Sequence, residues 1–292
     1  MKDFEALFAE YSCDIADEIV KKEVEKIINE HYAENDNVEV YKKCLNLIDL
    51  TTLNGDDTTE KVKTVVEKVN NFSENYSNIP NVAAICVYPA LVETVKENLT
   101  QKLGIAAVSA GFPASQTFIE VKIAETALSV QAGASEIDVV ISVGKFLEKN
   151  YDEVFDELQE IKAACGESHL KVILETGALK TAENIKKASV LAMEAGADFI
   201  KTSTGKITVS ATLEATYVMC KAIKEWYEKT GEKVGYKPAG GISTTEEAVK
   251  HYTIVKQILG NDWLNNNSFR FGASRLANNL LSSILGKEEK YF

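Results

Sequence analysis

The chain alternates short apolar runs with longer segments whose apolar residues recur at helical spacing. Eight runs rich in β-branched residues can be counted, over residues 45–53, 82–88, 105–110, 136–142, 170–175, 198–203, 234–237 and 268–271. Continuous apolar runs of this length are typical of strands buried on both faces, as in a parallel sheet. Their starts lie about 32 residues apart on average, which is the size of one strand plus one helix. Eight such units predict a (β/α)8 barrel.

The segments between these runs carry signals for helix starts and ends. Starts are predicted at Asp57-Thr58, Pro89, Ser115, Thr181, Ser210 and Ser243. Ends are predicted where glycine can adopt a left-handed conformation, at Gly133, Gly196 and Gly260. A doubly wound open sheet would show the same alternation of strands and helices. The count of eight and the lack of a G-x-G-x-x-G motif after the first run favour the closed barrel.

The first 40 residues have a different pattern. Many charged residues separate apolar positions at helical spacing, which are Phe4, Leu7, Phe8, Ile15, Ile19, Val24, Ile27 and Ile28. This pattern predicts one or two amphipathic helices. We therefore divide the chain into an N-terminal helical extension, residues 1–40, and a barrel domain, residues 41–292.

Composition and charge narrow the range of partners. The 292-residue chain has 32 Lys and Arg against 44 Asp and Glu, which gives a net charge of −12. This charge disfavours broad electrostatic binding to nucleic acid or an anionic membrane, so an anionic ligand needs a local cluster of cations and N–H groups. The five cysteines include no C-x-x-C pair, and neither an export signal nor an apolar stretch of about 18 residues is recognised. These features predict a cytoplasmic protein with reduced thiols.

Charged residues stand at or near the ends of several predicted strands, where a (β/α)8 barrel places its active site. They are Asp49, Asp138, Lys201 and Lys237. Two lysines on neighbouring strands would bring two ammonium groups together in a buried place, so that one of them can lose its proton and act as a nucleophile. The structural alternative is an ion network in which the lysines neutralise Asp49, Asp138 or Glu175.

A second set of residues is suited to binding a phosphate group. Gly205-Lys206, Gly240-Gly241 and Gly272-Ala273-Ser274-Arg275 follow the sixth, seventh and eighth runs. Barrel enzymes often bind phosphate in the loops after strands 7 and 8, where N–H groups of a helix N-terminus face the anion. Each glycine taken alone is better explained as a turn residue. Their coincidence at adjacent strand ends, beside a hydroxyl and two cations, favours a phosphate site.

Metal and thiol chemistry have less support. His31, His169 and His251 are far apart in the sequence, and His169 would stand at the wrong end of its strand. We therefore predict no metal site and no cofactor. Cys86 lies near the end of the second run, but a buried free thiol that packs in the core explains it better.

Seven segments resemble the deoxyribose-phosphate aldolase family, which consists of class I aldolases with the TIM-barrel fold. They are LIDLTTL (47–53), AICVYP (84–89), EIDVV (136–140), KVILETG (171–177), DFIKTSTGK (198–206), GYKPAGG (235–241) and RFGAS (270–274). The resemblance spans residues 45 to about 285. Its most specific part is the segment from Lys201 to Lys206.

The resemblance implies a reaction and a set of site residues. The reaction is the reversible, metal-free cleavage of 2-deoxy-D-ribose 5-phosphate into acetaldehyde and D-glyceraldehyde 3-phosphate. The resemblance implies that Lys201 forms a Schiff base, that Lys237 lowers the pKa of Lys201, and that Asp138 takes part in proton transfer. The implied substrate-binding residues are Asp49, Thr204, Gly205, Lys206, Gly240, Gly241, Gly272 and Ser274.

Some features depart from the family or leave alternatives open. Arg275 stands where the family commonly has a second serine, so it either adds a salt bridge to the phosphate or points outward. Tyr291 is offset from the family's C-terminal tyrosine and is assigned no role. The alternative functions are a Schiff-base aldolase or sugar-phosphate lyase with another chain-length preference, and a non-catalytic sugar-phosphate binder. The two lysines and Asp138 argue against the binder. The oligomeric state stays open, with a homo-oligomer as one option.

Overall fold

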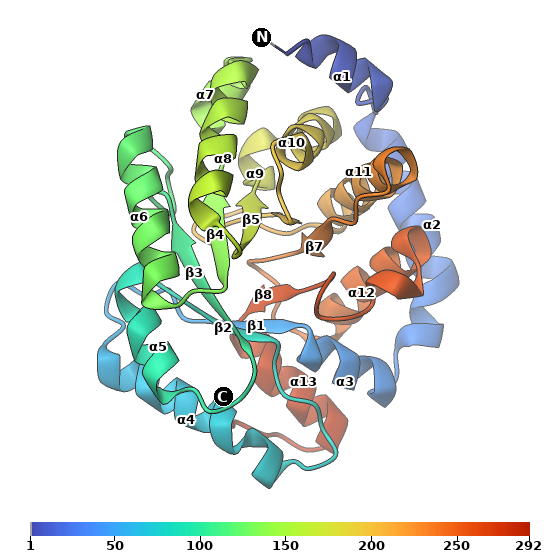
Figure 1. Cartoon of the computed structure of the whole chain (residues 1–292). Helices are drawn as coiled ribbons and strands as arrows, with labels where there is room; N and C mark the ends of the chain where they lie inside the picture. Colours follow the sequence, from blue (N-terminus) through green and yellow to red (C-terminus); the bar gives the residue numbers. More distant parts are fainter. Residues whose placement is uncertain (1) are drawn as a thin grey trace.

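The structure is a computed structural model, and it describes residues 2–292. Within this range eight parallel strands form one sheet in the order β7-β6-β5-β4-β3-β2-β1-β8. Bridges between Tyr236 and Phe269 and between Ala239 and Gly272 bring β7 beside β8 and close the sheet (Figure 1). The strands are β1 (Ile48–Thr51), β2 (Ala84–Val87), β3 (Gly104–Ser109), β4 (Glu136–Val140), β5 (His169–Ile173), β6 (Phe199–Lys201), β7 (Gly235–Lys237) and β8 (Phe271–Ala273). The predicted (β/α)8 barrel is confirmed, and each predicted run overlaps one strand.

Helices follow the strands along the chain and surround the barrel (Figure 1). They are α4 (Thr59–Asn75), η1 (Pro89–Leu91), α5 (Val92–Asn98), α6 (Ile119–Ala132), α7 (Val143–Leu147), α8 (Tyr151–Cys165), α9 (Thr176–Leu179), α10 (Ala182–Glu194), α11 (Leu213–Thr230), α12 (Thr245–Leu259), η2 (Asn261–Trp263) and α13 (Arg275–Leu285). Their buried apolar residues pack on the outward side chains of the strands and form one large core with them.

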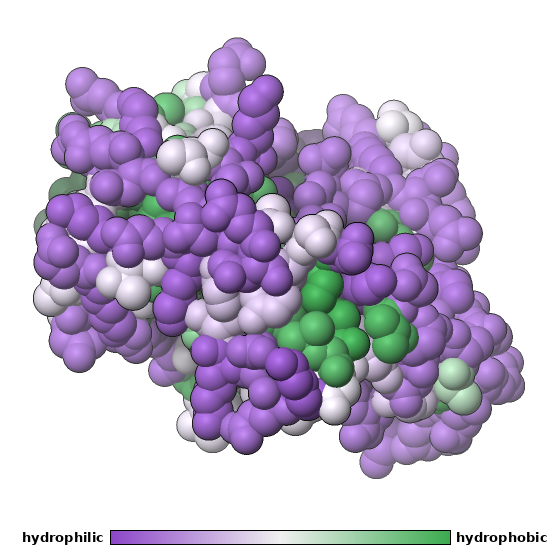
Figure 2. All heavy atoms as spheres, turned by 90° about the horizontal axis from the view of Figure 1, so that it is seen from below, coloured by the Kyte–Doolittle hydropathy of each residue, from purple (hydrophilic) through white to green (hydrophobic). Residues whose placement is uncertain are grey.

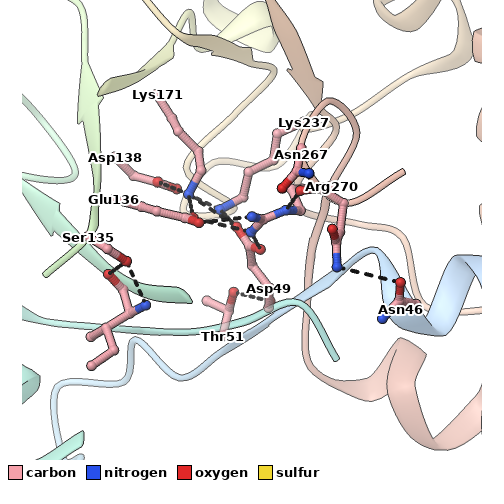
Figure 3. A network of polar contacts seen from close by, with 12 residues as sticks. Asn46, Asp49, Thr51, Ser135, Glu136, Asp138, Lys171, Lys237, Asn267 and Arg270 are labelled. Atoms are coloured by element: carbon pink, nitrogen blue, oxygen red, sulfur yellow. Dashed lines mark hydrogen bonds and ion pairs between the residues drawn. The ribbon is translucent and has the colours of Figure 1, made fainter. Parts of the chain in front are cut away.

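The alternation of side chains along each strand gives the barrel an apolar outer face and a partly polar interior. In β4, Ile137 and Val139 belong to the large core between strands and helices. Glu136 and Asp138 occupy the alternate positions, and their side chains meet other charged groups inside the barrel (Figure 3). Inside the barrel there is also a small apolar cluster, made of Leu53, Cys86, Ala106 and Val108.

Several predicted helix starts agree with the structure. Pro89 is the first residue of η1. α4 and α10 begin after Thr58 and Thr181, whose hydroxyls accept a hydrogen bond from the backbone N–H three residues later. α12 begins one residue later than predicted, because Thr244 rather than Ser243 forms a reciprocal capping box with Glu247.

Two predicted starts are wrong. α6 follows Phe118 rather than Ser115, because Ser115 has a φ of 57°, in the left-handed region, and belongs to the preceding loop. α11 follows Thr212 rather than Ser210, because the Thr212 hydroxyl caps the helix while the Ser210 hydroxyl donates to the carbonyl of Ile207. At the other end of α6, Gly133 ends the helix in the left-handed conformation, as predicted.

Residues 2–40 contain two complete helices, in agreement with the prediction, and the start of a third that crosses residue 40. They are α1 (Phe4–Glu10), α2 (Asp17–Asn35) and α3 (Val38–Asn46). α1 packs through Phe4 and Phe8 on Tyr151 of α8. α2 lies against α11 and α12, and α3 lies against α12 and α13 (Figure 1). These helices therefore add an outer layer to the barrel and share its core.

The C-terminal tail is docked on the barrel wall. The Tyr291 hydroxyl donates to the carbonyl of Lys68 on α4, at 2.8 Å. The Asn278 side chain on α13 accepts from the N–H groups of Tyr291 and Phe292 and donates to the carbonyl of Phe292. The ring of Phe292 stacks on Phe72 of α4. The tail thus ties α4 to α13.

The outer surface is largely hydrophilic on the face shown in Figure 2, where apolar residues gather in a few places. Among residues 2–292, no helix combines the length and the apolar character that a membrane crossing requires.

Candidate active site

A pocket of about 230 Å³ lies at the carboxyl ends of the strands. Its walls come from the segments that follow β1, β6, β7 and β8. Its lining residues include Lys201, Thr204, Gly205, Lys206, Gly240, Gly241, Gly272, Ser274 and Arg275. The structure therefore gathers the predicted glycines, Ser274 and Arg275 around one pocket. Arg275 lines it as well and is exposed, and its salt bridge to a phosphate stays a prediction.

Lys201 and Lys237 point to the same place from neighbouring strands. They are directly paired in the register of β6 and β7. Both side chains are buried, and both ammonium nitrogens contact the same carboxylate oxygen, Oδ2 of Asp138, at 2.7 and 2.8 Å. Lys201 lines the pocket, whereas Lys237 is fully buried. The juxtaposition of two amines that the sequence predicts is present.

A larger ion network surrounds these lysines inside the barrel, and Figure 3 shows the part of it around Lys171, Lys237 and Arg270. Within residues 2–292 it joins three carboxylates to four basic groups: Asp49, Glu136, Asp138, Lys171, Lys201, Lys237 and Arg270. The carboxylates come from β1 and β4. The basic groups come from β5, β6, β7 and the residue before β8. The sequence analysis missed Glu136, Lys171 and Arg270 as members of this network. Lys171 carried a readable signal, because it is a basic residue in the middle of an apolar run.

The contacts in the network are unequally distributed among the basic groups. Lys171 contacts Asp138 at 3.1 Å and Asp49 at 3.4 Å, and it also pairs with Glu136. Lys237 pairs with both Asp49 and Asp138. For Lys201, Asp138 is the single carboxylate partner among residues 2–292. Lys201 is therefore the least compensated of the buried amines.

Because of this distribution, the pKa values of Lys201 and Lys237 shift in opposite directions. Burial and the nearby charge of Lys237 lower the pKa of Lys201, although Asp138 opposes this shift. Burial also disfavours charge on Lys237, but Asp138 and Asp49 outweigh it and raise the pKa of Lys237. Lys201 therefore loses its proton more readily than Lys237 does.

The carboxylates are held in their charged form. Burial opposes the ionisation of Asp138, but Lys171, Lys201 and Lys237 outweigh it and keep the pKa of this carboxyl well below its usual value. The pKa of Asp49 is lowered in the same way. With three charged carboxylates, the network is electrically balanced when one of its basic groups is neutral. The geometry thus contains both the ion network and the amine pair that the sequence left as alternatives.

Glu175 was considered above as a carboxylate that neutralises one of the lysines, but in the structure it has other partners. It accepts hydrogen bonds from the N–H and the hydroxyl of Thr204, at 3.2 and 2.6 Å. The Thr204 hydroxyl in turn accepts from the N–H of Lys206, and the Lys206 amine donates to the carbonyl of Leu53. Glu175 adopts a left-handed φ of 58°, which is uncommon for this residue type. This chain of contacts fixes the loop after β6 along the edge of the pocket.

The glycines of the pocket allow close contacts between backbones. Gly240 has a φ of 80°, and a Cβ at this position would lie 2.8 Å from the Cα of Gly205. A Cβ at Gly272 would lie 2.7 Å from the Cβ of Ala239 and 3.2 Å from the side chain of Lys237. α13 begins at Arg275, and both this residue and Ser274 before it line the pocket, at the end of the helix that carries free N–H groups. Such an arrangement favours an anion.

The remaining candidate groups are one thiol and two imidazoles. Cys86 is fully buried in the small apolar cluster inside the barrel, and burial raises the pKa of its thiol. His251 is buried beside Thr216, and burial lowers its pKa to about 4. His169 begins β5, at the opposite end from the pocket, as predicted.

Comparison with known proteins agrees with this geometry. The family model described as "DeoC/LacD family aldolase" matches residues 43–267. Deoxyribose-phosphate aldolase of Homo sapiens is 43% identical over 82% of this chain and 78% of the human protein. The enzyme of Mus musculus is 43% identical over the same shares. The deoxyribose phosphate aldolase of Aeropyrum pernix, described as a unique tetrameric structure, superposes with a TM-score of 0.66 at 24% identity. That match covers 85% of this chain and 94% of the archaeal chain, and it supports the fold.

Proposed function

The chain belongs to the DeoC/LacD family of aldolases, and on this premise we propose that it is a deoxyribose-phosphate aldolase. The reaction is the reversible cleavage of 2-deoxy-D-ribose 5-phosphate into acetaldehyde and D-glyceraldehyde 3-phosphate through a Schiff base on Lys201. The observation that carries the assignment is the position of Lys201. It is a buried amine with a lowered pKa that also lines the pocket.

The chemical steps follow from a neutral amine at this position. The Lys201 nitrogen attacks the aldehyde carbon of the sugar, and loss of water gives an iminium ion. The bond between carbons 2 and 3 then breaks, and its electron pair moves into the iminium, which becomes an enamine. The hydroxyl on carbon 3 loses its proton and becomes the carbonyl of glyceraldehyde 3-phosphate. Protonation of the enamine and addition of water release acetaldehyde and restore the amine.

Asp138 and Lys237 are the proposed proton carriers. Asp138 lies 2.7 Å from the Lys201 nitrogen and 2.8 Å from the Lys237 nitrogen, so that one carboxylate oxygen contacts both amines. Lys237 keeps its proton because Asp49 and Asp138 raise its pKa. General acid and base groups at such positions typically contribute about 10² to 10⁴ in rate.

The far end of the pocket suits the phosphate of the substrate. The proposed ligands are the N–H groups around Gly205, Gly240, Gly241 and Gly272, the hydroxyl of Ser274, and the start of α13. Arg275 and Lys206 line the same pocket and supply positive charge, although the net charge of the chain is −12. Thr204 and Asp49 complete the proposed set, with Thr204 on the pocket wall and Asp49 holding Lys237.

The test is to trap the Schiff base. We expect reduction with borohydride in the presence of substrate to add mass to Lys201, and Lys201→Ala to abolish turnover. Lys186→Met is a matched control, because Lys186 is also a buried, ion-paired lysine but pairs with Glu225 away from the pocket. The control variant should keep its turnover. An active Lys201→Ala enzyme, or mass found on another lysine, would contradict the assignment.

The proposal extends to the organisation of the protein. Residues 41–292 form the catalytic unit and residues 1–40 the extension, which is supported by a family match that starts at residue 43. We place the protein in the cytoplasm, because its five cysteines are unpaired thiols in the described part of the chain. Its partners are small phosphorylated sugars and aldehydes, together with other copies of the chain in a homo-oligomer. Light scattering of the purified protein measures the oligomeric state.

A further inference from the structure

We infer that Arg270 is a positioning residue. It binds Asp49 and Glu136, and Asp138 is thereby left as the carboxylate partner of Lys201. The inference rests on the proposed function of Lys201 as the nucleophile. Arg270 precedes β8 and contacts Asp49 and Glu136, and Lys171 and Lys237 link these two carboxylates to Asp138, the partner of Lys201.

The guanidinium of Arg270 is built into the network from several sides. Its Nη1 donates to Oδ1 of Asp49 at 2.5 Å, and its Nη2 donates to Oε1 of Glu136 at 2.8 Å. Its Nε donates to the carbonyl of Asn266, and the group lies 6.0 Å from the ring centre of Phe199. Arg270 is 6% exposed. A planar fork that is held in this way fixes two carboxylates at once.

The division of the carboxylate oxygens follows from this contact. Because Arg270 takes Oδ1 of Asp49, the other oxygen of Asp49 faces Lys237 and Lys171. Glu136 is shared between Arg270 and Lys171. Lys201 thus meets the carboxylate of Asp138, which it shares with two other lysines. Every other basic group in the network contacts more carboxylates than Lys201 does.

The charge balance leads to the same conclusion. In the part of the chain that the structure describes, the network has four basic groups and three carboxylates, so it is balanced with Lys201 neutral. Without Arg270 it would have three of each, and the balance would require a protonated Lys201. The groups that face Lys201 are Asp138 on β4, Lys237 on β7 and the thiol of Cys86 on β2, and Arg270 changes none of them directly.

The first test is Arg270→Met. The rate at which acetaldehyde traps Lys201 falls on the acid side of its pH profile, where the amine is protonated, and we call this fall the acid limb. In Arg270→Met we expect the acid limb to move upward by about one pH unit, because a positive charge near a buried amine has been removed. Arg270→Lys keeps the charge, so its acid limb should stay near that of the unaltered protein even if its rate falls. A purely structural role would change rates and melting temperature but would leave the position of the limb unchanged.

The second test reverses the effect without restoring the arginine. Glu136→Met alone removes a negative charge and should not move the limb upward. The double variant Arg270→Met/Glu136→Met has two carboxylates and three basic groups, so the limb should return to within about 0.3 units of its original position. Replacing both partners of a buried ion pair with apolar residues is often neutral for stability, so the double variant should fold.

The outcomes separate this inference from the proposed function. If the unaltered protein shows no trapping at Lys201, the proposed function fails. If trapping occurs but Arg270→Met leaves the limb in place, or the double variant keeps the full shift of the single one, the inference fails alone. The rate of carbamoylation of Lys201 by cyanate, followed by peptide mass spectrometry against pH, reports the same amine without catalysis. The pH at which carbamoylation slows should rank the variants in the same order as the acid limb of trapping does.

Discussion

Lys171 and Lys201 lie on neighbouring strands and differ in their surroundings. Lys171 is fully buried and contacts three carboxylates, which overcome the effect of burial and raise its pKa. Lys201 is almost as buried but contacts Asp138, and its pKa is lowered. Burial by itself therefore does not make a lysine nucleophilic. Between these two lysines, the direction of the pKa shift follows the number of carboxylates that the buried amine contacts.

The largest effect is expected when the carboxylate common to both lysines is neutralised. Asp138→Asn should lower turnover by about 10² to 10⁴, because proton transfer is lost. Lys201 should still be trapped by acetaldehyde and borohydride, because the loss of a negative charge favours its neutral form. Steady-state rates and mass spectrometry measure the two properties separately. Loss of both properties in a folded variant would mean that Asp138 does more than move protons.

The comparison also predicts a difference in stability. Lys171→Met should cost about 3–5 kcal/mol of unfolding free energy, because it removes a buried cation that contacts Asp49, Glu136 and Asp138 at once. Lys201→Met should cost about 1 kcal/mol, because it removes one hydrogen bond of a neutral group. Urea unfolding of both variants, which have the same replacement on adjacent strands, measures the difference. Equal losses would contradict the distinction between the two lysines.

The pH dependence of the reaction tests the sign of the shift at Lys201. A neutral amine is required for attack, so kcat/KM should fall about tenfold per pH unit below the pKa of Lys201 in the folded protein. Since this pKa is lowered, the fall should begin below the ordinary lysine value of about 10.4. Rates measured between about pH 5 and pH 10 locate it. A fall that begins near pH 10 would show an unperturbed amine.

A smaller effect is expected at the other end of the pocket. Gly240→Ala should raise KM for the phosphorylated sugar by about tenfold, or about 1.4 kcal/mol, because a Cβ there meets the backbone of Gly205. Gly286→Ala is the matched control. Gly286 also has a positive φ, of 67°, but nothing lies within 4 Å of its Cβ position. It should change stability and leave KM unaltered.

The fold was predictable because its signals are local and repeated. Each strand is a compact apolar run, and the number of runs fixes the barrel. The helix starts were less predictable, since Ser115, Ser210 and Ser243 compete with neighbouring residues whose backbone conformation is set by loops. Lys201 and Lys237 were found because they end their strands.

The rest of the network was not predicted, for a physical reason. Glu136 starts its strand, Lys171 lies in the middle of its strand, and Arg270 lies before β8, so none of them stands at a strand end where a barrel carries its active site. Their mutual contacts depend on the register of strands that are far apart in the sequence. A basic residue within an apolar run was the readable sign, but its partners become visible only in the closed barrel.

The division of charge along the chain has a consequence for how the barrel assembles. The strands of the first half, β1 to β4, supply the acidic members of the network, and the second half supplies the basic members. A half-barrel that collapsed during synthesis would bury charges of one sign, at a cost of several kcal/mol per ion. Each half thus lacks the counterions that would let it close by itself. Separately expressed halves should remain open and find each other, which makes the junction between α8 and β5 a rational place to split this protein into complementing fragments.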